Sequence, residues 1–131
     1  MIVVDSNIVA HLYLPGDHSA AAEALLTNDP EWVAPILWRS ELRNVLATYN
    51  RTKRLTLEQA TAVQNEAEGL LEGAEFEVDS STVLQLAHDS QCPAYECEFV
   101  ALAMMLDCKL ATMDKKILRA FPGLAVALSS R

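Results

Sequence analysis

The fold is decided by the first seven residues, Met1–Asn7, which read MIVVDSN. The β-branched run Ile2–Val4 is apolar at every position, which is typical of a short strand buried on both faces of a sheet. The run ends at Asp5, and the next two residues, Ser6 and Asn7, are types that often begin a helix. In open α/β sheets, ligands bind at the carboxyl ends of the strands. Asp5 is therefore either a candidate site residue or the cap of the following helix.

Short apolar runs alternate with amphipathic segments along the rest of the chain. We expect further strands at 31–34, 75–78, 109–112 and 124–128, and helices at 18–27, 36–50, 56–71, 80–88, 95–106 and 115–120. A capping box is expected at Thr56 and Gln59, and Ser80 or Ser81 is expected to cap the next helix. This alternation predicts an α/β fold: a single three-layer α/β/α domain over residues 1–131, with a central, mainly parallel sheet of about five short strands.

The composition fits one intracellular domain. The hydrophobic fraction of 51% over 131 residues suffices for an ordinary core. The apolar stretch Phe99–Leu106 is too short to cross a bilayer, and no basic region precedes the first apolar run, as it would in a secretory signal. Cys92, Cys97 and Cys108 form no CxxC pair and have no histidine at metal-ligand spacing. We therefore expect buried, reduced thiols, a cytoplasmic location and no membrane partner.

The formal net charge of −8 argues against a general nucleic-acid binder, which normally carries a basic surface. One exception is a protein whose carboxylates cluster around divalent cations, because the loaded site is then no longer negative. Two basic clusters, at 51–54 and 115–119, are either contacts for a polyanion or solvated helix ends.

Two acids, Asp5 and Asp114, share one placement: each follows an apolar strand and precedes a helix. If strands 2–4 and 109–112 are neighbours where the strand order reverses, the two carboxylates face each other across the binding crevice.

Two glutamates lie unusually close to apolar helix faces. Glu41 lies at the border of the apolar stripe of its helix, as an ordinary surface residue or as a ligand aimed into a cleft. Glu96 shares a face with Phe99 and Val100, where a carboxylate is rare unless it is paired or binds a metal. The first helical turn, where the macrodipole favours negative charge, offers a second explanation for Glu96. Glu98 points about 200° away, so we expect only one of the pair in the site, and the pattern alone does not exclude Glu98.

Four stretches carry these acids in order, at 3–7 (VVDSN), 35–44 (PILWRSELRN), 94–103 (AYECEFVALA) and 110–114 (LATMD). Together they resemble the acidic blocks of PIN-domain ribonucleases, and most closely those of VapC-type toxins of toxin–antitoxin pairs. The resemblance covers essentially the whole chain and is specific in order and spacing. It places the family's acids on Asp5, Glu41, Glu96 and Asp114. It also matches Thr112 to the hydroxyl residue before the last acid and Asn44 to the asparagine after the helix glutamate.

The resemblance implies a metal-dependent endoribonuclease that hydrolyses RNA phosphodiester bonds with Mg²⁺ or Mn²⁺. All four acids would be catalytic; Asp5, Glu96 and Asp114 would hold the metal, and Glu41 would hold a water or a second metal. Such a cation activates water and clamps phosphate oxygens. The implied partners are the RNA substrate, an antitoxin protein and a second copy of the chain in a homodimer.

The third block departs from the family pattern, because Glu96 stands where an aspartate is usual. Its extra methylene moves the carboxylate outward, and octahedral Mg²⁺ tolerates little geometric slack. The alternative is therefore a catalytically degenerate PIN-like module that binds or regulates. A phosphoacceptor receiver domain also carries an aspartate at a strand end, but it needs paired acids after the first strand, which Asp5-Ser6-Asn7 lacks.

Overall fold

The computed structural model describes residues 1–129. Its sheet has five strands, all parallel, in the order β3-β2-β1-β4-β5. Their bounds are β1 Ile2–Val4, β2 Trp32–Pro35, β3 Glu75–Phe76, β4 Lys109–Ala111 and β5 Ala125–Val126. β1 is the central strand and its three residues are all buried, as the unbroken apolar run predicted.

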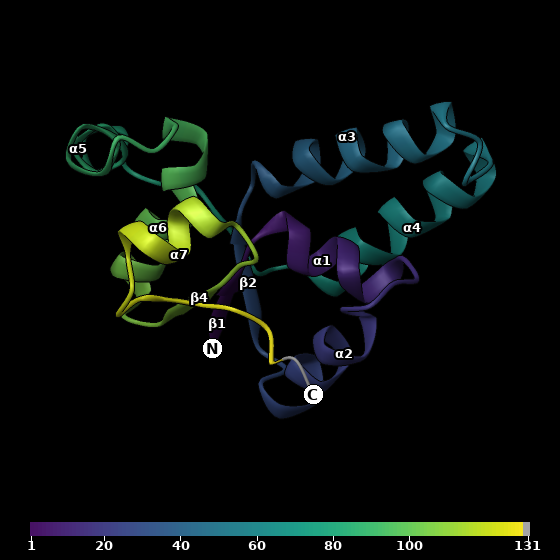
Figure 1. Ribbon diagram of the computed structural model, residues 1–131, viewed down its shortest axis with the longest axis horizontal. Helices are drawn as coiled ribbons and strands as arrows, with labels where there is room; N and C mark the ends of the chain where they lie inside the picture. The colour runs from purple at the N-terminus through teal and green to yellow at the C-terminus, as the bar shows by residue number, and fades with distance from the viewer. Residues whose placement is uncertain (130–131) are drawn as a thin grey trace.

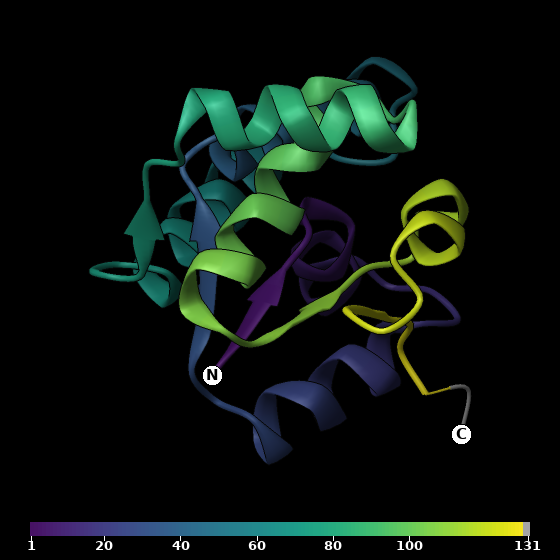
Figure 2. The same cartoon turned by 90° about the vertical axis from the view of Figure 1, so that its left-hand side faces the viewer.

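Helices cover both faces of the sheet, which confirms the predicted three-layer α/β/α fold (Figure 1). Within residues 1–129 they are α1 Ser6–Tyr13, α2 Ser19–Asn28, α3 Trp38–Arg51, α4 Leu57–Leu70, α5 Ser80–Ser90, α6 Ala94–Leu106 and α7 Lys115–Ala120. Helices α1 to α4 lie on one side of the sheet, and α1 contacts β1. On the other side, α6 packs on β1, β2 and β4, and α5 packs on α6. Figure 2 shows α6, in light green, lying in front of the strands.

The predicted elements all form, with shifts at their ends. The capping box of α4 is present, with Gln59 N donating to Thr56 Oγ1 and Thr56 N donating to Gln59 Oε1. The prediction of Ser80 or Ser81 as the cap of α5 was wrong, because Asp79 accepts the N–H of Thr82 and caps that helix. Strands β3 and β5 are shorter than predicted; each lies at an edge of the sheet and pairs with a single neighbour.

Helix α6 is buried in its middle and exposed at its ends. Cys97 and the run from Phe99 to Ala103 are buried, whereas Tyr95, Met104 and Met105 are exposed. The prediction of a helix buried all round was therefore wrong at the ends, which extend past the sheet. The three cysteines are free thiols, with Cys108 only partly buried. Among residues 1–129, no helix has the length and apolar character needed to cross a bilayer.

A charged network fixes the start of α3. Arg39 donates through Nε and Nη2 to the two carboxylate oxygens of Glu75, both at 2.6 Å, and through Nη1 to Glu68 at 3.1 Å. The indole N–H of the fully buried Trp38 donates to Glu75 Oε2 at 2.7 Å, as a buried Trp N–H requires a partner. We call these four residues, Trp38, Arg39, Glu68 and Glu75, the Arg39 network. It holds the first turn of α3, which contains Glu41, against β3 and α4.

Candidate functional site

Strands β1 and β4 are neighbours, and this brings Asp5 close to the turn that contains Asp114. Val4 pairs with Ala111, and the backbone N–H of Asp5 donates to the Ala111 carbonyl at 2.9 Å. The chain runs from β1 outward to β2 and β3, then returns to β4 and β5 on the other side, so the strand order reverses between β1 and β4. The predicted adjacency is confirmed at the point where doubly wound sheets bind ligands.

Asp5 caps α1, which confirms one of the two alternatives raised by its position, and its role as a site residue stays a prediction. Its Oδ1 accepts the N–H of Ser6 at 2.7 Å, and its Oδ2 accepts the Thr112 hydroxyl at 2.7 Å. Burial raises the pKa of Asp5 above its usual value, and the charge of Asp114 raises it further. The hydrogen bonds from Thr112 and Ser6 act in the opposite direction, because they stabilise the carboxylate.

Ser6 joins two acids from distant parts of the chain. Its buried hydroxyl donates to Glu41 Oε1 at 2.7 Å and lies 3.2 Å from Asp5 Oδ1. A hydroxyl carries a single proton, so it serves both oxygens fully only when one of the acids is itself protonated and donates to it. From the sequence, Ser6 was expected only to be a residue that begins a helix. The signal for a bridging role was a small hydroxyl residue directly after a strand-end acid.

Glu41 has a strongly raised pKa. Burial raises its pKa to about 7, and the charges of Asp5, Glu96 and Glu98 add to the rise, while the Ser6 hydrogen bond lowers it. These three acids come from β1 and α6, whereas Glu41 comes from α3. The predicted position at the border of the apolar stripe therefore places Glu41 beside the other acids.

Asp114 is held in place through Thr112 and α7. The backbone N–H of Asp114 donates to Thr112 Oγ1 at 3.0 Å, and this hydroxyl in turn donates to Asp5. Oδ1 of Asp114 accepts the N–H groups of Lys116 and Ile117 and so caps α7. Within residues 1–129, no N–H group donates to Oδ2 of Asp114, and a hydrogen bond between the Asp114 and Glu96 carboxyl groups raises the pKa of Glu96.

Glu96 has one carboxylate oxygen near a lysine and one that is buried without a donor. Its Oε2 is buried and has no hydrogen-bond partner among residues 1–129, and its Oε1 lies 3.9 Å from Lys116 Nζ. Burial raises the pKa of Glu96, as do the nearby carboxylates of Asp114 and Asp5, while Lys116 lowers it. Helix capping alone does not explain a buried carboxylate oxygen without a donor.

We call Asp5, Glu41, Glu96 and Asp114 the acid cluster. An all-oxygen donor set is what hard divalent cations prefer, and the unpartnered Glu96 Oε2 needs a donor or a cation, so these residues fit Mg²⁺ or Mn²⁺ in their chemistry. As the side chains lie, no three His, Cys, Asp or Glu residues of the described chain are arranged to hold a metal ion. Asp5 and Asp114 direct oxygens to helix N–H groups instead. The ligand role of Asp5, Glu96 and Asp114 stays a prediction.

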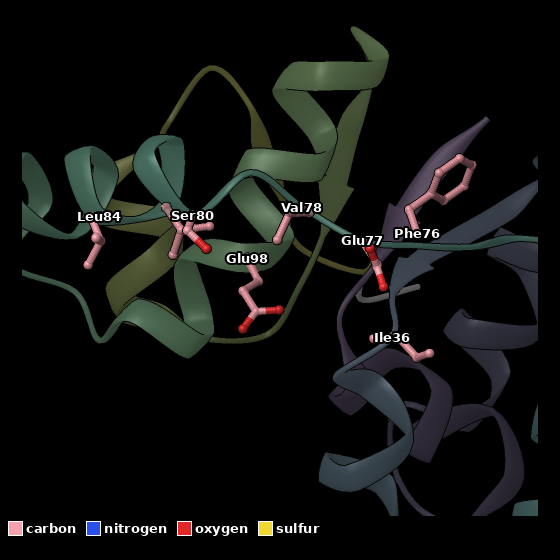
Figure 3. Close-up of a pocket in the computed structure, with 8 residues that line it drawn as sticks. Ile36, Phe76, Glu77, Val78, Ser80, Leu84 and Glu98 are labelled. Atoms are coloured by element: carbon pink, nitrogen blue, oxygen red, sulfur yellow. The ribbon is translucent and has the colours of Figure 1, made fainter.

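Some of the residues singled out in the sequence lie away from the acid cluster. Asn44 is exposed, and its side chain makes no hydrogen bond within residues 1–129. The basic cluster at 51–54 lies at the far tip of the α3–α4 hairpin (Figure 1). The other basic cluster is close, because Lys116 approaches Glu96. Glu98 is not part of the cluster but lines a pocket beside it (Figure 3).

The comparisons with known proteins identify a family for the chain and agree with its fold. The family model of the PIN domain matches residues 2–122. Among curated proteins, Ribonuclease VapC3 of Pyrobaculum aerophilum is 27% identical over 128 residues, which cover 94% of this chain and 96% of that protein.

Solved structures share the fold at low sequence identity. PAE2754 from Pyrobaculum aerophilum has a TM-score of 0.77 at 18% identity and covers 96% of this chain and 89% of its own. FitAB bound to an IR36 DNA fragment has a TM-score of 0.75 at 16% identity, covering 97% of this chain and 94% of its own. FitAcB from Neisseria gonorrhoeae has a TM-score of 0.71 at 16% identity, covering 99% and 98%.

Proposed function

The chain belongs to the PIN domain family, and on that premise we propose that it is a metal-dependent endoribonuclease that hydrolyses RNA phosphodiester bonds. The observation that carries the proposal is the acid cluster, in which Asp5 after β1, Glu41 of α3, Glu96 of α6 and Asp114 before α7 meet at one end of the sheet, and burial and neighbouring carboxylates raise the pKa of the first three. The buried and unpartnered Glu96 Oε2 adds to it. The relative named Ribonuclease VapC3 supports RNA as the substrate class.

Asp5, Glu96 and Asp114 would hold the cation, Mg²⁺ or Mn²⁺, with Glu41 beside them. A bound divalent cation would supply an activated water and neutralise charge on the phosphate. Glu96 Oε2 and Asp114 Oδ2 are the oxygens best suited to it, because no N–H or hydroxyl group of the described residues donates to either, and the cation would replace the proton that the two carboxyl groups share.

The remaining residues of the site orient carboxylates and hold protons. Thr112 and Ser6 hydrogen-bond to opposite oxygens of Asp5, which fixes the orientation of that carboxylate and favours its charged form. Glu41, with its pKa near 7, holds a proton at Oε1 or releases it close to neutral pH, where a general acid or base is most effective. The Ser6 hydroxyl lies between Glu41 and Asp5, so protonation of Glu41 changes the hydrogen bonding of Asp5.

Lys116 is the cation best placed for the substrate. It lies 3.9 Å from Glu96 and is more than half exposed, so its ammonium can also contact a phosphate of an RNA strand. In a protein of net charge −8, a cation at the acid cluster offsets repulsion of the RNA backbone where the phosphate must approach.

We further propose that the protein is the toxin of a toxin–antitoxin pair, with a cytoplasmic location, an antitoxin protein as partner and a homodimeric state. The VapC name of the relative and the resemblance of the four acidic blocks support this. A reading frame for a small DNA-binding protein directly upstream would support the pairing. Light scattering at micromolar concentration should give the mass of a dimer, and a monomer mass would refute the homodimer.

An RNA cleavage assay tests the nuclease proposal. Single-stranded RNA should be cut with Mg²⁺ or Mn²⁺ and left intact in EDTA. Glu96→Asp should raise cleavage, because it restores the reach usual in the family, whereas Glu96→Gln should lower it at least tenfold through loss of a charged ligand. Glu72→Gln makes the same chemical change at an exposed position outside the acid cluster and should leave cleavage unchanged. A wild type inactive with every metal, alongside an equally inactive Glu96→Asp, would favour a degenerate binding module.

A further inference from the structure

A hollow lies near the acid cluster. It has a volume of about 430 Å³ and is formed where β3 leads into α5, where β2 ends, and along α6. Its walls include Ile36, Val78, Leu84, Glu77 and Glu98 (Figure 3). We call it the Glu98 pocket. Its size is in the range of pockets that bind small molecules or single nucleobases.

The Glu98 pocket and the acid cluster both lie at the carboxyl ends of the strands. Glu98 follows Glu96 by two residues on α6, and its charge contributes to the raised pKa of Glu41. Ile36 directly follows β2, and its backbone N–H donates to the carbonyl of Phe76, the last residue of β3. A strand of nucleic acid with a phosphate at the acid cluster would therefore have a neighbouring nucleotide at this pocket.

The lining of the Glu98 pocket combines apolar side chains with the polar groups of Glu77, Ser80 and Glu98. Ile36 and Leu84 are 55% and 64% exposed, which is unusual for large apolar side chains beside a hollow unless something covers them. Glu98 projects from α6 into the space between them (Figure 3). Within residues 1–129 its partly buried carboxylate makes no hydrogen bond and no ion pair, so both oxygens are left to accept. Glu77 stands exposed at the rim.

We propose that the Glu98 pocket binds a guanine base of the RNA strand, next to the phosphate at the acid cluster; this rests on the proposed ribonuclease function. Guanine presents two adjacent donors, N1–H and the N2 amino group, which match the two oxygens of one carboxylate. Uracil flanks its single N–H with carbonyls that a carboxylate repels, and adenine and cytosine pair their amino group with an acceptor nitrogen. Apolar walls suit the faces of an unstacked base in single-stranded RNA.

A binding experiment decides this proposal without relying on cleavage. Fluorescence anisotropy of labelled RNA hexamers that differ only in one central base is measured with the Asp5→Asn variant, which should not cut them. The guanine hexamer should bind about tenfold tighter than the uracil hexamer, as expected for a bidentate contact. Adding Glu98→Gln should reduce this preference to about twofold or less, because the amide offers one acceptor and one donor. Adding Glu72→Gln should leave it unchanged.

Equal binding of all four hexamers, or a preference that Glu98→Gln leaves intact, would overturn the proposal. Binding of N-acetylarginine amide that depends on Glu98, without a base preference, would also overturn it and assign the pocket to a basic side chain of a protein partner. Mapping the cuts in a random-sequence RNA with Mg²⁺ separates the two claims. Cleavage without guanine preference would leave the nuclease proposal standing and refute this one, whereas guanine-selective binding without cleavage would do the reverse.

Discussion

Arg39 and Glu41 lie two positions apart on helix α3, and their surroundings are opposite in kind. In the Arg39 network each charge has a partner, and the hydrogen bonds from Arg39 together with that from Trp38 hold the pKa of Glu75 below its usual value. In the acid cluster the neighbours of Glu41 are other acids, and its pKa rises to about 7. The same turn of α3 thus contributes to the Arg39 network, in which opposite charges are paired, and to the acid cluster, in which like charges lie close together.

The difference shows which of the two groups serves the fold. The Arg39 network joins α3 to β3 and α4 through directed hydrogen bonds, so losing a member should weaken the folded state. In the acid cluster, partly buried like charges repel one another, which costs stability unless a cation or protons offset them. Residues that destabilise a protein in this way are typical of binding and catalytic sites.

Among substitutions in the two groups, the largest expected effect is on catalysis, from a change in the acid cluster. Asp5→Asn keeps the size of the side chain and an oxygen for the Ser6 N–H, and its amide can donate to the Thr112 hydroxyl. RNA cleavage should fall at least a hundredfold through loss of a ligand charge. The free energy of unfolding, measured by urea titration without metal, should stay equal or rise because one repelling charge is gone. A strong loss of stability with cleavage retained would mean that Asp5 is only a helix cap.

A substitution in the Arg39 network should instead lower the stability of the protein. Glu75→Gln removes the charge that accepts from Arg39 and Trp38. The free energy of unfolding should fall by about 2 kcal/mol, as expected for lost hydrogen bonds between charged groups. Glu72→Gln, an exposed glutamate of the same region, is the matched control. If Glu75→Gln leaves the urea midpoint unchanged, the Arg39 network does not stabilise the fold.

A smaller effect should appear in the pH dependence of stability. The folded protein keeps the proton of Glu41 up to about pH 7, while the unfolded chain loses it near the ordinary value of 4.5. The folded state therefore binds more protons in this window, and stability falls as the pH rises from about 4.5 to about 7. Glu41→Gln should remove part of that slope. At about pH 8 its free energy of unfolding should exceed that of the wild type by on the order of 1 kcal/mol, after allowing for solvent screening. Parallel curves for the two proteins would show that Glu41 is not perturbed.

The sequence predicted the strand-end acids well, because a carboxylate directly after a buried run is a local pattern. It predicted Asp5 and Asp114 at strand ends, but only tertiary pairing of β1 with β4 brings them together. Lys116 was a candidate phosphate contact because it lies near the last acid in the sequence, but its approach to Glu96 and the bond of Ser6 to Glu41 are contacts with acids distant in the chain, which spacing does not predict. The cap of α5 was mispredicted because Asp, Ser and Ser follow one another there, and any of the three is a good cap type.

The choice between Glu96 and Glu98 shows the same limit. Periodicity separated their directions on α6, yet both lie near the same edge of the sheet, one in the acid cluster and one in the Glu98 pocket. A helical wheel gives the angle between two side chains but not what surrounds each of them. That depends on β2, on which α6 packs, on Lys116 of α7 beside Glu96, and on the residues after β3 that line the pocket with Glu98.

Calorimetric titration of Mn²⁺ tests most directly whether the acid cluster is a cation site. The wild type and Glu75→Gln should bind Mn²⁺ with similar affinity, because the Arg39 network stabilises the fold without touching the metal. Asp5→Asn and Glu96→Gln should each weaken binding at least tenfold, since each removes a ligand charge. Wild-type affinity in the Asp5→Asn variant, or no binding in the wild type, would contradict the account.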